Sequence, residues 1–166
     1  MTEILGIGTD LVDLDRFRVV LARTPRIVQR VFTDGEQAYA CARRDPSERL
    51  GARFAAKEAA MKALGVGLGV VDFRDLEVVR LVSGAPELEV RGRAGERAGA
   101  LGVRRWLLTM SHTHLLAQAV VVALGADDEG RRRGTPDDAM TQRVVRRAVQ
   151  DHLALDRRRR RGESSG

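Results

Sequence analysis

The sequence is poor in cysteine and in aromatic residues, and both shortages restrict what the chain can be. Its single cysteine, Cys41, excludes an internal disulfide framework and is typical of a reducing cytoplasm. Aromatic residues make up only 4% of the chain, so stacking platforms for single-stranded nucleic acid are scarce. No apolar run approaches the about 20 residues that cross a bilayer, and no signal-peptide pattern opens the chain. We therefore expect a cytoplasmic protein without a membrane partner.

The residues that are present favour one packed domain with an anionic partner. The chain has 166 residues, which suggests one domain and an appendage, and 43% of them are hydrophobic. The formal net charge is +6 and the isoelectric point is about 10.8. This balance predicts binding to nucleic acid, to a phosphate-rich small molecule or to an acidic protein.

The middle of the chain predicts one long amphipathic helix from about Glu48, with Gly65 as its stop. Alanines, which have strong helix propensity, fill many of the positions between its apolar residues. Those apolar residues recur at roughly helical spacing: Leu50, Phe54, Met61 and Leu64.

This helix carries the only two lysines of the chain, Lys57 and Lys62, whereas every other basic residue is an arginine. Arg53 and Lys57 are four residues apart and share a face, and Glu58 and Lys62 share the adjacent face. Two interpretations are open: a solvated helix with one Glu–Lys pair, or a helix that carries a functional site.

Residues 4–12 predict a short, buried strand in which Gly6 and Gly8 allow close backbone approach. Asp10 is anomalous there, because an unpaired buried carboxylate is costly. Asp10 is therefore either a cap for the helix that follows from about Asp13, or a metal ligand held on a rigid element.

Two helices are expected next: the first is rich in arginine, and the second has a recognisable N-terminal cap. The first spans about residues 13–29 and is interrupted or restarted at Pro25. The second begins at a capping box, with Thr33 as the cap and Glu36 three residues later, and runs to about Arg44.

The second half of the domain is expected to be mostly strands. Residues 73–81 and 87–91 predict a hairpin, residues 94–101 a short helix closed by Gly102, and residues 106–111 and 116–124 two further strands. His112 and His114, two of the three histidines, fall between these last strands. A lone histidine is more often a core or surface residue, but strand ends often build sites.

Three motifs together resemble the holo-acyl-carrier-protein synthase family of phosphopantetheinyl transferases. They are residues 6–12 (GIGTDLV) with Arg16, residues 53–65 (RFAAKEAAMKALG), and residues 109–113 (TMSHT). The order and spacing of the motifs fit, and the resemblance covers about residues 3–125.

The resemblance implies an α+β fold in which a small antiparallel sheet packs against a long central helix and shorter helices. Residues 1–125 would form this phosphopantetheinyl transferase domain. The short, single-lobed members of the family are trimers, so a homotrimer with sites at subunit interfaces is implied as well.

The implied activity is transfer of the 4′-phosphopantetheine group of coenzyme A to a serine of an apo acyl carrier protein or carrier domain. Adenosine 3′,5′-bisphosphate would be released, with Mg²⁺ as cofactor. By resemblance, Asp10 and Glu58 are the metal ligands, and Lys62 is catalytic with them because its charge meets the pyrophosphate. Glu58 would also act as the base, through a metal-ordered water. The residues implied to line the coenzyme A cleft are Arg53, Lys57, Lys62, Gly65, His112 and Thr113.

Carrier proteins are acidic, so three arginines of the helix after the first strand would dock the carrier: Arg16, Arg23 and Arg26. Fatty acid, polyketide and peptide synthesis all supply candidate carriers.

The chain departs from the family pattern in two places. Ala85 stands between the glycine and the proline of the hairpin turn, where a basic residue is common, and this weakens the argument that the turn contributes charge to the nucleotide. Residues 126–166 form a basic C-terminal extension, expected to contain a linker, a short amphipathic helix and a disordered Arg-rich end.

Two other functions remain open at this point. The charge and the arginine-rich end would also suit a nucleic-acid-binding module, although no nucleic-acid motif is recognisable. An inactive scaffold of the same fold is the other alternative, and the presence of Asp10, Glu58 and Lys62 argues against it.

Overall fold

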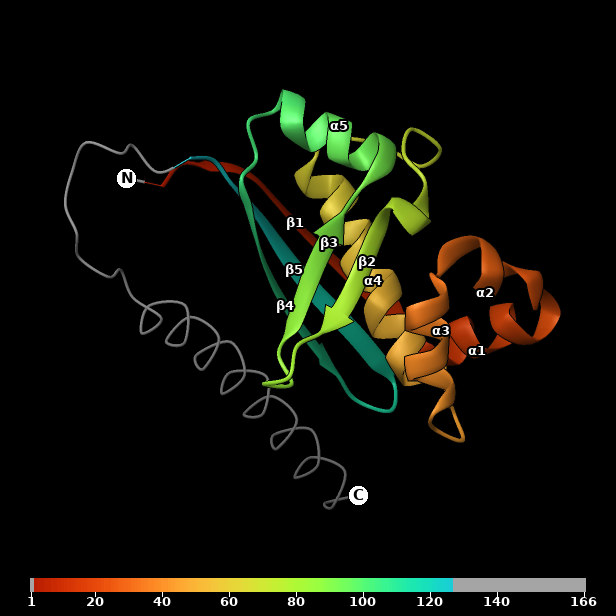
Figure 1. Ribbon diagram of the computed structural model, residues 1–166. Helices are drawn as coiled ribbons and strands as arrows, with labels where there is room; N and C mark the ends of the chain where they lie inside the picture. Colours follow the sequence, from red (N-terminus) through yellow and green to blue (C-terminus); the bar gives the residue numbers. More distant parts are fainter. Residues whose placement is uncertain (1, 127–166) are drawn as a thin grey trace, which may run out of the picture. The chain divides into compact units, whose positions relative to one another are not determined.

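The computed structural model describes residues 2–126 (Figure 1). Along this part of the chain, one strand is followed by four helices and then by two pairs of strands with a helix between the pairs; the longest helix occupies the middle. The elements are β1 (Ile4–Asp13), α1 (Leu14–Arg23), α2 (Arg26–Val31), α3 (Asp34–Cys41), α4 (Ser47–Ala63), the 3₁₀ turn η1 (Phe73–Asp75), β2 (Leu76–Arg80), β3 (Pro86–Val90), α5 (Gly92–Ala100), β4 (Arg105–His112) and β5 (Leu116–Leu124).

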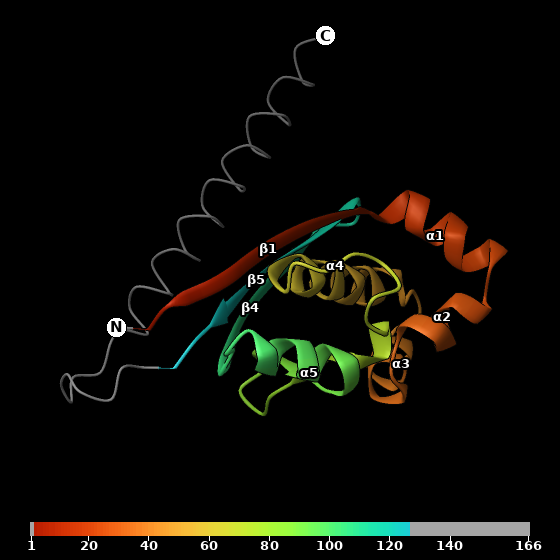
Figure 2. The same ribbon diagram turned by 90° about the horizontal axis from the view of Figure 1, so that it is seen from above.

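The main sheet is antiparallel, with the strand order β1-β5-β4, and α4 lies against one of its faces (Figure 2). The expected small sheet packed against a long central helix is therefore confirmed. Glycines of β1 let the helix approach closely: a Cβ atom at Gly8 would lie 1.9 Å from the carbonyl oxygen of Ala59. One at Gly6 would lie 2.0 Å from the carbonyl oxygen of Ala63.

The predicted hairpin forms a second sheet of two strands, β2 and β3. Leu76, Val78 and Leu88 bury their side chains in the core. The first residues of the expected strand form η1 instead, because the Asp72 side chain accepts a hydrogen bond from the backbone N–H of Arg74 and caps a helical turn.

Local signals place most helix boundaries correctly. The chain restarts as α2 directly after Pro25, and the capping box of Thr33 and Glu36 is present at the start of α3. Gly65 has a φ of 66° and ends α4 as predicted. The expected end near Arg44 of the helix capped by Thr33 is wrong, since α3 stops at Cys41.

The expectation that the first strand is buried holds for only one of its faces. Gly8 and Val12 are buried against α4, whereas Ile7 is 66% exposed and Leu11 is 60% exposed on the opposite face. No element of residues 2–126 covers this outward apolar face.

The predicted C-terminal extension lies outside the described residues, apart from Ala126. Its linker, helix and Arg-rich end therefore stay predictions, as does the domain boundary at residue 125. Within the described part of the chain, none of the helices has the length and hydrophobicity needed to cross a bilayer.

Candidate functional site

The first part of the site is a cluster of Asp10, Glu58 and Lys62 between β1 and α4. Asp10 faces the helix because it lies two residues from Gly8 and two from Val12, on the same face of the strand as both. Lys62 Nζ lies 2.7 Å from Asp10 Oδ1 and donates to the carbonyl oxygen of Thr9 at 2.9 Å. The structure thus brings together the three residues predicted to be catalytic.

Asp10 does not cap the following helix, which was the alternative interpretation of this residue. The cap of α1 is Asp13, whose Oδ1 accepts a hydrogen bond from the backbone N–H of Arg16 at 2.9 Å. Asp10 is left with Lys62 as its ion-pair partner.

The negative charge of the Glu58 carboxylate is electrostatically unfavourable in this cluster. Partial burial raises the pKa of its carboxyl above the ordinary value, the nearby Asp10 carboxylate raises the pKa further, and Lys62 lowers it. Two carboxylates that repel each other in a half-buried position are a chemically suitable donor pair for a divalent cation. No described residues form a set of three or more candidate metal-ligating side chains, so water or substrate oxygens would have to complete such a site.

The second part is an arginine-rich cleft of about 700 Å³. Arg53, which is only 5% exposed, places its guanidinium carbon 4.1 Å from the centre of the Tyr39 ring, and Arg49 does the same at 4.3 Å. Arg49 also donates to the carbonyl oxygen of Tyr39 at 2.6 Å. The residues that line the cleft are Tyr39, Arg43, Arg44, Asp45, Glu48, Arg49, Ala52, Arg53, Arg80, Gly84, Pro86, Met110 and His112.

Arg53 is partly unsatisfied in this cleft. Burial lowers the pKa of its guanidinium, while the carboxylate of Glu36 acts in the opposite direction. Its buried Nε has no hydrogen-bond partner among the described residues. A buried cationic donor without a partner is suited to an anionic ligand.

His112 reaches the same cleft from the end of β4. Its Nδ1 lies 3.8 Å from Glu48 Oε2, and its side chain is about half exposed. Arg53 and His112, which the sequence places far apart, are thus brought together.

Three other residues predicted to bind coenzyme A do not line this cleft. Thr113 shapes the turn between β4 and β5, where its hydroxyl accepts the backbone N–H groups of Leu115 and Leu116. Gly65 is exposed at the end of α4, and Lys62 belongs to the cluster with Asp10.

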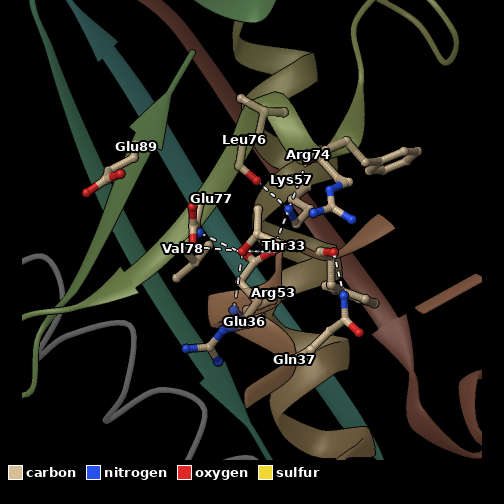
Figure 3. Close-up of polar contacts among 12 residues, drawn as sticks. Thr33, Glu36, Gln37, Arg53, Lys57, Arg74, Leu76, Glu77, Val78 and Glu89 are labelled. Carbon is tan, nitrogen blue, oxygen red and sulfur yellow. Dashed lines mark hydrogen bonds and ion pairs between the residues drawn. The ribbon is translucent and has the colours of Figure 1, made fainter. Parts of the chain in front are cut away.

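The structure corrects the fourth prediction, that Lys57 contacts the cofactor, because its side chain is fully buried. Figure 3 shows the polar groups that surround it. Lys57 Nζ lies 2.8 Å from Glu36 Oε2 and donates to the carbonyl oxygens of Phe73 and Leu76. Burial lowers the pKa of the Lys57 ammonium, and the carboxylate of Glu36 opposes this shift. Lys57 joins α3, α4 and the start of β2 in the interior, where it is a structural residue.

The sequence interpretation missed Tyr39, Arg49 and Arg80 as lining residues of the cleft. Tyr39 is the only tyrosine in the chain, which by itself is only a weak indication that the residue belongs to a site. Arg49 lies one helical turn before Arg53, so the face shared by Arg53 and Lys57 could have been extended to it.

The arginines predicted to dock a carrier, Arg16, Arg23 and Arg26, are all exposed. Arg18, in contrast, is paired within the chain, because its guanidinium contacts Asp15 at 2.9 Å and Asp45 at 3.2 Å.

The cluster and the cleft are separate on one chain. None of the residues that line the cleft is Asp10, Glu58 or Lys62. A ligand that needs both parts would have to span two surfaces or two copies of the chain.

Comparison with known proteins gives one consistent answer. Residues 6–119 match the 4′-phosphopantetheinyl transferase superfamily. The holo-[acyl-carrier-protein] synthase of Moorella thermoacetica is 43% identical over 118 residues, which cover 71% of this chain and 92% of that protein. The crystal structure of the corresponding synthase from Neisseria meningitidis aligns with a TM-score of 0.67 at 33% identity, over 73% of this chain and 98% of that one. A Bacillus anthracis synthase in complex with coenzyme A (3′,5′-ADP) aligns with a TM-score of 0.63 at 32% identity, over 74% and 98% of the two chains.

Proposed function

The chain belongs to the 4′-phosphopantetheinyl transferase superfamily, and from this membership we infer that it is a holo-acyl-carrier-protein synthase. It transfers the 4′-phosphopantetheine group of coenzyme A to a serine of an apo acyl carrier protein. The observation that carries this proposal is that the matched region holds both a paired carboxylate cluster with a lysine and a cation-rich cleft. The single cysteine supports a cytoplasmic location.

The carboxylate cluster supplies the groups that the transfer needs. Asp10 and Glu58 would hold Mg²⁺, which, when bound, neutralises charge on the diphosphate of coenzyme A. Lys62 adds a mobile positive charge beside them. Glu58 would accept the proton of the attacking serine hydroxyl through an ordered water. The other product would be adenosine 3′,5′-bisphosphate.

The complete site would be shared between copies in a homotrimer. The Asp10 cluster and the arginine cleft are separate on one chain, so the cluster of one copy would face the cleft of its neighbour. The outward face of β1 supports this assembly, because Ile7 and Leu11 expose apolar surface that a neighbour would bury.

The basic face of α1 and α2 would guide the acidic carrier to the site. Arg16, Arg23 and Arg26 are exposed and available for an approaching partner, whereas Arg18 is paired within the chain. Such steering acts mainly on the rate of association and weakens as salt increases.

An intact-mass assay tests the transferase proposal. The protein is mixed with coenzyme A, Mg²⁺ and a panel of apo carrier proteins, with and without a chelator. We expect a phosphopantetheine-sized mass gain on a carrier, lost with the chelator and in Asp10→Ala and Glu58→Ala. Glu96→Ala, which removes an exposed carboxylate on α5, is the matched control and should retain transfer. Absence of any mass gain from folded protein would overturn the proposal.

A further inference from the structure

Arg80 is a cation that the proposed mechanism has not used. It is the last residue of β2, its side chain is exposed, and it lines the arginine-rich cleft. Arg80 Nε donates to the carbonyl oxygen of Gly84 at 3.4 Å, which ties the guanidinium to the turn between β2 and β3. The guanidinium carbon lies 5.9 Å from the centre of the Tyr39 ring.

Three guanidinium groups from two elements therefore surround one aromatic ring. Arg49 and Arg53 come from α4, and Arg80 comes from β2 on the other side of the cleft. Tyr39 offers each of them a cation–π contact, which fixes their positions without neutralising their charge. Like charges gathered at this distance repel one another, and a bound anion would relieve the repulsion.

The carboxylates of the cleft do not neutralise these three arginines. Among residues 2–126, no carboxylate lies within ion-pair distance of Arg49, Arg53 or Arg80. Asp45 is paired with Arg18, and Glu48 lies beside His112.

We propose that Arg80 is a further coenzyme A-binding residue, which contacts the 3′-phosphate of the nucleotide together with Arg49 and Arg53. The inference rests on the proposed transferase function. Coenzyme A carries two phosphate-bearing groups, the diphosphate and the 3′-phosphate. In the proposed mechanism the diphosphate binds at the cluster of Asp10 and Glu58. The 3′-phosphate is therefore the remaining anionic group of coenzyme A that could bind in the cleft.

The proposal also changes the interpretation of the hairpin turn. Ala85 itself brings no charge to the turn, which weakened the argument from the sequence that the turn contributes charge to the nucleotide. Arg80 lies four residues before Gly84, and its guanidinium packs against the turn at Gly84. Tyr39 is a positioning residue in this arrangement, because its ring orients the guanidinium groups and is not itself charged.

Nucleotide binding by calorimetry tests the assignment without requiring turnover. Wild-type protein, Arg80→Ala and Arg93→Ala are titrated with adenosine 3′,5′-bisphosphate and with adenosine 5′-monophosphate, which lacks the 3′-phosphate. Arg93 is an exposed arginine of α5 outside the cleft, so its variant matches the change in net charge. We expect Arg80→Ala to bind the bisphosphate about tenfold more weakly, as for the loss of one charge-assisted contact, and the monophosphate unchanged. Equal weakening for both nucleotides, or no weakening, overturns the assignment.

A kinetic measurement separates this assignment from the proposed function. Turnover is measured with coenzyme A and with dephospho-coenzyme A at saturating carrier. In Arg80→Ala the KM for coenzyme A should rise while kcat and the constants for dephospho-coenzyme A stay nearly unchanged. If the wild type binds the bisphosphate but modifies no carrier, the transferase proposal fails while the role of Arg80 stands.

Substitutions of Tyr39 test the positioning role. Tyr39→Phe keeps the ring and should bind the bisphosphate like the wild type, whereas Tyr39→Leu should bind it more weakly while keeping its affinity for the monophosphate. A Tyr39→Leu variant that folds and binds the bisphosphate normally would contradict the role of the ring.

Discussion

At the residue scale, Glu58 carries a charge that the folded chain disfavours. Its pKa in the folded state is raised, first by burial and then by Asp10, so the protonated carboxyl favours folding. This contribution is fully present below the unfolded pKa and is lost as the pH rises through the folded pKa. In the metal-free protein at neutral pH, the ionised carboxyl therefore lowers the stability of the fold.

Replacement of Glu58 by Gln should accordingly stabilise the metal-free protein at neutral pH. Because the side chain is partly exposed, we expect a modest rise in Tm of about 1–2 °C at pH 7. The difference from wild type should disappear near pH 4, where the native carboxyl is protonated. Thermal unfolding in a chelator across this pH range measures the effect, with Glu96→Gln as the control. A lower Tm for Glu58→Gln at pH 7 would show that the attraction of Lys62 dominates.

The two lysines of α4 provide a second comparison at this scale, because one is fully buried and the other is half exposed. Lys57→Met would leave the carboxylate of Glu36 buried without its partner, which should destabilise the protein by about 3–5 kcal/mol. Lys62→Met removes the more exposed pair with Asp10 and should cost less than about 1 kcal/mol. Urea unfolding of the two variants measures the difference.

The double variant Glu36→Gln with Lys57→Met checks the cause. It removes the uncompensated charge while the glutamine can still accept a hydrogen bond from Val78, so it should recover part of the lost stability. Equal stability of Lys57→Met and wild type would show that the ion pair is unimportant for the fold.

At the scale of elements, the contact of β1 with α4 decides where Asp10 lies relative to Glu58. The contact is close because the strand presents glycines to the helix, and a Cβ atom at Gly8 would overlap the backbone of α4. Neither side of this clash is a flexible side chain, so an added methyl group must move the strand or the helix.

Gly8→Ala should therefore destabilise the protein by about 3 kcal/mol or more and reduce transfer, because the carboxylates are displaced. Gly67→Ala is the matched control, since a Cβ atom there has nothing within 4 Å and its φ is not positive. Denaturant unfolding and the mass assay together measure both effects. Near-equal stability of the two alanine variants would exclude the close contact as a determinant of the site.

At the scale of the whole molecule, the outward face of β1 gives a prediction about assembly. Ile7 is 66% exposed in the single chain, and we propose that a neighbouring copy covers it. Ile7→Glu should convert the trimer into monomers, because a buried unpaired carboxylate at the interface would be strongly unfavourable. These monomers should lose transfer activity, since each would lack a neighbour's half of the site.

Size-exclusion chromatography with light scattering measures the assembly. Leu68→Glu is the control, because Leu68 is a 71% exposed apolar residue that does not line the cleft, and this variant should leave the trimer intact. A fully active monomer, in either the wild type or Ile7→Glu, would contradict the shared site.

Much of the fold and part of the site could be predicted from the sequence. The spacing of Leu50, Met61 and Leu64 located α4, and Gly65 located its end. The strand that carries Asp10 was also found, and the structure brings this residue to Lys62 as expected.

What the sequence determined by itself was local: helix caps, the restart after Pro25, the hairpin, and the pairs of residues four apart on α4. These features depend on interactions within one or two turns of the chain. The tertiary structure alone decided the burial of Lys57 against Glu36 and the meeting of Arg80 with Tyr39. Burial and charge pairing depend on neighbours contributed by other elements. A charged residue on a helix therefore has the same local pattern whether it faces solvent or the core.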